Sequence, residues 1–161
     1  MLPGSLLIIP LYIIMKNMGM LDSLFGLVIA YSTVAIPFCT WMLKGYFDTI
    51  PSTIDEAAMV DGAGRWTTFT RIALPMTLPG LVVTGIFSFL TSWNEFLFAL
   101  TFISDYGKWT LSVGIASFQG QYLIHWNYLM AGSVMTTLPI VLAFWLLQKY
   151  LVSGMTAGAV K

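Results

Sequence analysis

Long apolar stretches alternate with one polar interval along this chain. The stretch Ser23–Leu43 and the stretch Ile72–Asn94 carry no formal charge, and residues 109–148 contain no Asp, Glu, Lys or Arg. A helix needs about 20 mostly apolar residues to cross a bilayer. The pattern therefore predicts complete membrane-spanning helices at about 23–43, 79–101 and 128–148.

The first residues form a shorter apolar segment. Met1–Met15 would be roughly 22 Å long as a helix, whereas the hydrocarbon core of a bilayer is about 30 Å thick. A signal peptide would have a basic start and a small-residue cleavage site, and neither is present. We expect residues 3–15 to be the second part of a span, and the chain to be a C-terminal fragment or a truncated gene product.

Composition excludes several classes of function. The chain is 58% hydrophobic and 9% charged, whereas soluble domains carry about 25% charged residues. A net charge of zero gives no basic face for nucleic acid. Cys39 and His125 are the only cysteine and histidine, so we expect no disulfide within the chain and no Cys/His metal site. The single Gly-Lys pair, Gly107-Lys108, precedes Trp109 and is no P-loop.

Charges concentrate in the interval 44–78. Half of the fourteen formal charges fall there: Lys44, Asp48, Asp55, Glu56, Asp61, Arg65 and Arg71. With the predicted spans, one side of the membrane receives five basic residues: Lys44, Arg65, Arg71, Lys149 and Lys161. The other side receives Lys16 and Lys108. Basic residues favour the cytoplasmic side, so the 44–78 loop and the C-terminus are predicted to be cytoplasmic.

Helix start and stop signals lie inside this loop. After Pro51, Thr53-Ile54-Asp55-Glu56 has the T-x-x-E pattern of a capping box, and Ser52 to Asp55 is a second possible one. Gly62 and Gly64 are natural stops. We predict a short helix over 53–61. One face would carry small and mixed side chains at helical spacing: Ile54, Ala57, Ala58 and Asp61. A second helical stretch is expected to follow, until Pro75 and Pro79 break or kink the chain. Pro139 is expected to kink the last span.

The loop also matches a longer pattern. Glu56-Ala57-Ala58, three residues, Gly62, nine residues and then Ile72-x-Leu74-Pro75 resembles the EAA loop of ABC importer permeases, E-A-A-x3-G-x9-I-x-L-P. Three further segments resemble the carbohydrate-importer branch, the maltose-permease type: Lys44–Phe47, Trp93–Phe96 and Leu151–Lys161.

The resemblance implies a fold and a role. The fold would be an all-α integral membrane protein, the C-terminal part of a type I ABC importer transmembrane domain, with about three full spans and one partial span. Glu56, Ala57, Ala58, Asp61 and Gly62 would belong to a coupling helix that docks on an ATPase subunit.

The same resemblance implies partners and a location. The chain would work with an ATPase dimer, a second permease subunit and an extracytoplasmic sugar-binding protein, in the cytoplasmic membrane of a bacterial cell. It would bind no cofactor itself, because ATP and Mg²⁺ would be held by the ATPase. We therefore expect no catalytic residue in this chain.

Glu95 is the one acid inside an otherwise apolar predicted span. An ionised group at the centre of a span is costly, so it should face protein or a water-filled path. With Trp93 and Asn94 it is a candidate for the translocation path, since an aromatic ring beside polar groups suits a sugar. The alternative is a structural hydrogen bond between helices.

Other functions are open from the residues alone. The cargo could be another polar solute, such as a polyol or a glycerol phosphate ester. The chain could also be a channel or secondary transporter subunit that needs no ATPase. An intramembrane enzyme would need paired ionisable groups inside spans, and Glu95 stands alone there.

Overall fold

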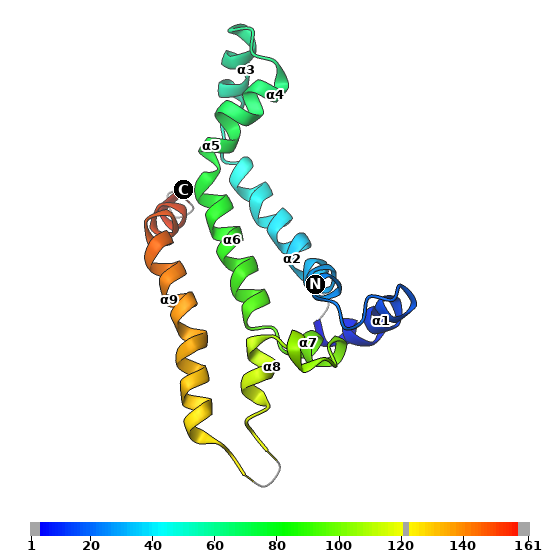
Figure 1. The fold of residues 1–161 in the computed structure, drawn as a ribbon. Coiled ribbons are helices and arrows are strands. Elements are labelled where there is room, and N and C mark those ends of the chain that lie inside the picture. Colours follow the sequence, from blue (N-terminus) through cyan, green and yellow to red (C-terminus); the bar gives the residue numbers. More distant parts are fainter. Residues whose placement is uncertain (1–3, 121–122, 158–161) are drawn as a thin grey trace. The chain divides into compact units, whose positions relative to one another are not determined.

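The computed structural model is helical and describes residues 4–120 and 123–157, with side chains as far as Lys149. Figure 1 shows the elements in chain order: α1 (Gly4–Asn17), α2 (Leu24–Phe47), α3 (Ser52–Val60), α4 (Arg65–Thr68), the π-helix η1 (Phe69–Ala73), α5 (Leu74–Met76), α6 (Leu78–Trp93), α7 (Leu97–Phe102), the 3₁₀-helix η2 (Tyr106–Lys108), α8 (Leu111–Ala116) and α9 (Trp126–Ala157).

The chain forms two compact units. The first draws on residues up to Ile36 and on Phe89–Ala143, and the second on Pro37–Ser88 and on residues from Phe144 onwards. The division runs through α2, α6 and α9, because each of these helices contributes residues to both units.

The first unit has a buried apolar core. Its members come from α1, α2, α7 and α8 and their flanking residues: Met15, Leu27, Ala30, Phe98, Ala99, Phe102, Ile103 and Val113. Tyr12 of α1 packs edge-on against Phe102 of α7, with ring centroids 6.0 Å apart. The short α7 is thus embedded in the core that α1 and α2 build.

The second unit contains a close contact between α2 and α6. Phe38 and Phe87 stack with ring centroids 3.9 Å apart, and the Cys39 Sγ and Ser88 Oγ atoms are hydrogen-bonded at 3.1 Å. A Cβ atom added at Gly80 would lie 2.4 Å from Tyr46 Cγ, so only glycine allows this approach. Small residues that permit close helix contact are common in membrane proteins.

Two helices among the described residues could cross a membrane by length and composition: Leu24–Phe47 and Trp126–Lys149. Arg65–Met76 and Leu78–Trp93 together would make a third, although a bend of 69° separates them. These helices coincide with the predicted spans at 23–43 and 128–148, and α9 continues through Pro139 as one helix. The predicted partial span corresponds to α1, an apolar helix of 14 residues, and Pro3 lies outside the described residues.

The predicted helix over 79–101 is interrupted. α6 ends at Trp93 and α7 begins at Leu97, so the range holds two helices with a break between them. A continuous helix would carry Glu95 along an apolar face, whereas the break lets its carboxylate accept backbone hydrogen bonds from Phe98 and Ala99.

Candidate functional site

The helix α3 begins and ends almost where the sequence predicts, but its start is built differently. Pro51 is the N-cap, with extended backbone (φ −61°, ψ 134°), and its carbonyl accepts the Ile54 N–H at 3.1 Å. No side chain caps the helix. The predicted capping box of Thr53 and Glu56 is therefore wrong, because the proline starts the helix at Ser52 and places Thr53 inside it.

The end of α3 is a Schellman motif. Gly62 adopts a left-handed conformation (φ +81°), its N–H donates to the Met59 carbonyl at 3.0 Å, and the Ala63 N–H donates to the Ala58 carbonyl at 2.9 Å. A Cβ atom at Gly62 would meet nothing within 4 Å. The requirement for glycine is therefore conformational, and it fixes the sharp end of the helix.

Two opposite faces of α3 have different surroundings. Ala58 is buried and Ile54 is half-buried on the inner face. The outer face is exposed and carries residues at i, i+3, i+4 and i+7 spacing: Thr53, Glu56, Ala57 and Val60. Val60 is 87% exposed. The residues predicted to share one face are thus divided between two faces. Ala57 is exposed, whereas Ile54 and Ala58 face the interior of the loop.

A groove lies on the inner side of α3. Its volume is about 430 Å³, and it is lined by Phe47, Ile50, Asp55, Met59, Arg65, Thr68, Phe69 and Ala73. The rings of Phe47 and Phe69, which both line the groove, stack with centroids 6.1 Å apart. The inner side of α3 therefore borders a mainly apolar groove.

The rest of the loop motif lies in the helical run that follows. Ile72 and Leu74 are half-buried in η1 and α5, and Pro75 is exposed in α5. Pro75 lacks the N–H that would bond to the Arg71 carbonyl, which accounts for the π-helix just before it. The predicted break near Pro75 falls at Thr77, where α5 ends and the chain bends before α6.

The second set of predicted site residues lies at the end of α6. The Trp93 indole N–H donates to the Thr136 carbonyl at 3.1 Å, and the Asn94 side-chain amide donates to the Leu90 carbonyl at 2.9 Å. The Glu95 carboxylate accepts the Phe98 N–H at 2.9 Å and the Ala99 N–H at 3.1 Å. The hydrogen bonds of all three side chains therefore go to backbone groups of α6, α7 and α9.

A small cavity adjoins Glu95 in the first unit. Its volume is about 180 Å³, and it is lined by Gly4, Ser5, Ile8, Tyr31, Val34, Thr91, Glu95, Leu97 and Phe98. Pockets for small-molecule ligands typically enclose about 300–1,000 Å³. The cavity is too small to enclose a disaccharide, and its lining is mainly apolar, with polar groups from Ser5, Tyr31, Thr91 and Glu95.

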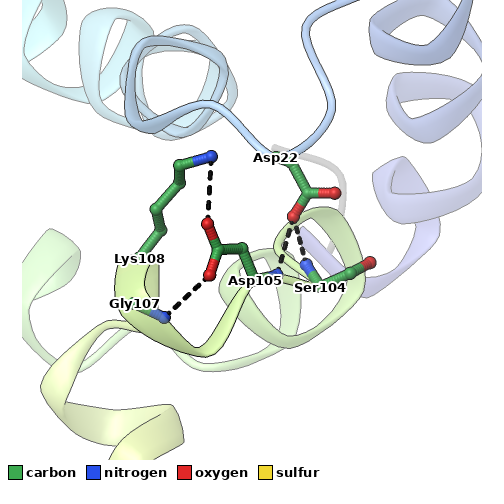
Figure 2. Close-up of polar contacts among 5 residues, drawn as sticks. All are labelled: Asp22, Ser104, Asp105, Gly107 and Lys108. Atoms are coloured by element: carbon green, nitrogen blue, oxygen red, sulfur yellow. Dashed lines mark hydrogen bonds and ion pairs between the residues drawn. The ribbon is translucent and has the colours of Figure 1, made fainter.

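Sequence reasoning missed Asp22, which ties two loops together (Figure 2). Its carboxylate accepts the Ser104 N–H at 2.5 Å and the Asp105 N–H at 2.9 Å, and its own N–H donates to the Phe102 carbonyl at 2.9 Å. An acid just before an apolar run suggests a helix cap for residues 24 onwards, but here it caps a distant loop instead.

The second acid in this loop stabilises the adjacent turn (Figure 2). The Asp105 carboxylate accepts the Gly107 N–H at 2.9 Å and lies 3.3 Å from the Lys108 ammonium. The hydrogen bond from Gly107 and then the contact with Lys108 hold the pKa of Asp105 below its ordinary value.

Comparisons with known proteins match the whole length of the chain. The family model described as "Binding-protein-dependent transport system inner membrane component" matches residues 1–157. An ABC transporter permease protein of Streptomyces antibioticus is 41% identical over 159 residues, 99% of this chain and 69% of the relative.

Two further relatives have named cargoes. The trehalose/maltose transport system permease protein MalG of Thermococcus litoralis is 42% identical over 162 residues, 100% of this chain. The diacetylchitobiose uptake system permease protein DasC of Streptomyces coelicolor is 38% identical over 161 residues, also 100% of this chain. The chain spans 58% of the length of each of these two relatives.

Proposed function

Because the chain belongs to the family of binding-protein-dependent transport system inner membrane components, we propose that it is the permease subunit of an ATP-driven sugar importer. The family membership makes it an inner-membrane component of an ABC importer. The sugar cargo is supported by two relatives, one named as a trehalose/maltose transport system permease and the other as a diacetylchitobiose uptake system permease.

The observation that carries the proposal is α3. It is a short helix with a packed inner face and an exposed outer face, and a left-handed glycine ends it sharply. The Glu56-Ala57-Ala58 and Gly62 positions of the EAA pattern fall on this helix and its end. A short helix with one exposed face and a sharply defined end is suited to receive a partner and to move with it.

The proposed cycle involves several partners. An extracytoplasmic binding protein delivers the sugar, and a second permease subunit completes the pathway. An ATPase dimer holds ATP and Mg²⁺ and closes on α3, which is placed in the cytoplasm with the 44–78 loop and the C-terminus. This chain then supplies no catalytic group, and changes in helix tilt alternate the access to the two faces of the membrane.

The outer face of α3 is the surface that we assign to the ATPase. Ala57 lies at its centre, between Thr53, Glu56 and Val60, and its methyl group allows a partner to approach the helix backbone closely. Ile54 and Ala58 face the interior of the loop and hold α3 in place. Glu56 and Ala57 would therefore act by contact, and Ala58 by packing.

Aspartate substitutions at the neighbouring alanines test this assignment. Ala57→Asp should leave the permease folded and abolish capture of the ATPase in a pull-down, because a charge would be buried without a partner in the interface. Ala58→Asp should instead destabilise the loop itself. Thr67→Asp adds the same charge at an exposed position off the docking face and is the matched control. Normal uptake and ATPase capture by Ala57→Asp would overturn the proposal.

Gly62→Asp tests the sharp end of α3. A non-glycine residue in the left-handed region costs about 1–2 kcal/mol, so the Schellman motif should be weakened and α3 misdirected. We expect ATP hydrolysis that no longer drives uptake in proteoliposomes containing the full permease complex. Coupled uptake at the wild-type ratio would contradict the proposed role of α3.

The cargo is tested by competition. Uptake of a labelled disaccharide should be ATP-dependent and should require the binding protein. Inhibition only by a polyol or a glycerol phosphate ester would assign a different cargo. Uptake that needs no ATPase would indicate a channel or secondary transporter.

A further inference from the structure

The segment Trp93–Phe96 breaks a helix inside an apolar part of the chain. In a bilayer, backbone groups freed by such a break must be bonded within the protein. The Ser112 hydroxyl donates to the Trp93 carbonyl at 3.0 Å, and the Asn94 N–H donates to the Leu90 carbonyl at 3.1 Å. The break is therefore a built feature with its own hydrogen-bond partners.

On one side of the break, α7 is fixed in the core. Phe98, Ala99 and Phe102 are all buried there, and the Phe102 carbonyl accepts the Asp22 N–H at 2.9 Å. Two of the free amides in the first turn of α7 belong to Phe98 and Ala99, and both donate to the Glu95 carboxylate. Glu95 thus replaces the turn of helix that α6 would otherwise have supplied.

On the other side, Trp93 at the end of α6 contacts a separate set of partners. Its indole N–H reaches the Thr136 carbonyl of α9, and its ring stacks on Phe89 with centroids 5.4 Å apart. Thr136 lies in the turn before Pro139, where the helix lacks one backbone hydrogen bond. Trp93 and Glu95 therefore hold the two sides of the break through separate groups of partners.

We propose that Glu95 is a positioning residue, which holds α7 in the α1–α2 core while the break leaves α6 able to change its angle. This inference rests on the proposed function, in which movement of α3 is passed along the chain to α6. The break between α6 and α7 would then act as a joint, in which Glu95 keeps α7 in place. It need not contact the sugar.

A carboxylate suits this position for a chemical reason. It offers two acceptor oxygens and no donor, so it can bond both amides at once, whereas glutamine would direct an N–H₂ group at one of them. Bonds to an ionised acceptor are also shorter and stronger than neutral ones. We therefore expect the order Glu, then Gln, then Ala in the ability to hold α7.

The cavity beside Glu95 gives the carboxylate room to move. Tyr31 and Thr91 line the same cavity, and the buried Tyr31 hydroxyl has no hydrogen-bond partner among the described residues. It is a donor within the cavity that the carboxylate borders. If Glu95 only capped α7, it would need neither the cavity nor the Tyr31 hydroxyl. A carboxylate that shifts during transport can move into the cavity and accept a hydrogen bond from Tyr31.

The test measures motion of α7 together with coupling. Cys39→Ala in the full permease removes the single cysteine of this chain, and Leu100→Cys, at a half-exposed position of α7, carries a nitroxide label. The complex with the ATPase and binding protein is reconstituted in proteoliposomes. Glu95→Gln and Glu95→Ala are compared with Ser117→Ala, whose exposed hydroxyl donates only to the Gly114 carbonyl of α8.

We expect the label to become more mobile in Glu95→Gln and most mobile in Glu95→Ala. Sugar transported per ATP should fall by about tenfold in Glu95→Ala, since charge-assisted hydrogen bonds are lost. Ser117→Ala should change neither quantity. Should Glu95→Ala fail to assemble, Glu95→Gln retains one acceptor and gives the same two readouts.

Failure of this inference can be distinguished from failure of the proposed function. An unchanged label spectrum and an unchanged transport-to-ATP ratio would overturn the proposed role of Glu95 in the joint. A lower melting temperature with an unchanged ratio would overturn it as well, because it would indicate only a structural cap. A wild-type complex that binds no ATPase would overturn the proposed function, whatever the label reports.

Discussion

The chain bends at the start of α6 and breaks at its end, and different kinds of residue stabilise the two positions. At its start the chain bends by 69° around Thr77, which is 1% exposed and donates its hydroxyl to the Ala73 and Leu74 carbonyls, both at 3.1 Å. At its end, the break is bonded by Glu95 and by groups from α8 and α9. The first end uses prolines and a neighbouring hydroxyl, whereas the second combines the local bonds of Glu95 with partners of Trp93 that are far away in the sequence.

The start of α6 is determined by residues that are adjacent in the sequence, whereas its end also depends on contacts with other helices. Pro75 and Pro79 remove backbone N–H groups wherever the chain is placed, so the first bend is encoded by a few adjacent residues. The break after Trp93 depends on Ser112 and Thr136 in other helices. We therefore expect the first end to tolerate distant mutations and the second to be sensitive to them.

The largest effect should come from Gly80→Ala, in the first turn of α6. The new Cβ atom would lie 2.4–2.9 Å from the near ring atoms of Tyr46, and such overpacking typically costs about 1–3 kcal/mol in the free energy of unfolding. We expect a lower melting temperature of the permease in detergent. Gly85→Ala is the matched control, because a Cβ atom there meets nothing within 4 Å.

A double substitution sharpens this result. Tyr46→Ala removes the ring, so adding it to Gly80→Ala should recover part of the lost stability relative to Tyr46→Ala alone. Additive losses would show that the α2–α6 contact does not limit the side chain at residue 80.

Thr77→Val tests the local hydroxyl at the first end. Valine keeps the shape of threonine and removes a buried hydrogen bond, for an expected loss of about 1 kcal/mol in the free energy of unfolding. Thr101→Val is the control, because its hydroxyl also bonds within a helix but is exposed. Equal melting temperatures for the two variants would indicate that burial of Thr77 adds nothing to the bend.

Trp93→Phe tests the tertiary partner at the second end. Phenylalanine retains stacking on Phe89 and loses the N–H that bonds to Thr136, so we expect a loss of roughly 0.5–1 kcal/mol in the free energy of unfolding. Hydrogen exchange near Pro139 should increase. Trp66→Phe, at a site that is 76% exposed, is the control and should have no effect.

The smallest effect is expected beyond α7, at Asp105. Its folded pKa is lowered, so the stability that it contributes is present above its ordinary pKa of about 4 and is lost as the pH falls through the lowered folded value. Asp105→Asn should slightly lower the melting temperature at neutral pH, and the difference should vanish in acid. A difference that grows in acid would contradict the assigned hydrogen bonds.

The sequence predicts much of this protein because some signals are local. Hydrophobic length predicts α2 and α9, and the glycine stop predicts the end of α3 within one residue. The prolines predict the bend at Thr77. Each of these features depends on residues that are adjacent along the chain.

Most of the features that the sequence did not reveal depend on contacts between distant elements, and Glu95 is the exception. Glu95 reads as an isolated acid in a span, because its partners are backbone amides and leave no pattern of side chains. The inner and outer faces of α3 were not separated, because the burial of Ala58 depends on the fold of the following loop. The Gly80–Tyr46 contact joins two helices and has no local signature.

The broken end of α6 also bears on how the protein is made. α6 alone is 16 residues, about 24 Å, and is shorter than the hydrocarbon core of a bilayer, yet residues 72–94 read as one apolar run. The partners of Trp93 lie 19 and 43 residues further along the chain. During synthesis the run is made before those partners. The break therefore matures only after α8 and α9 have been translated.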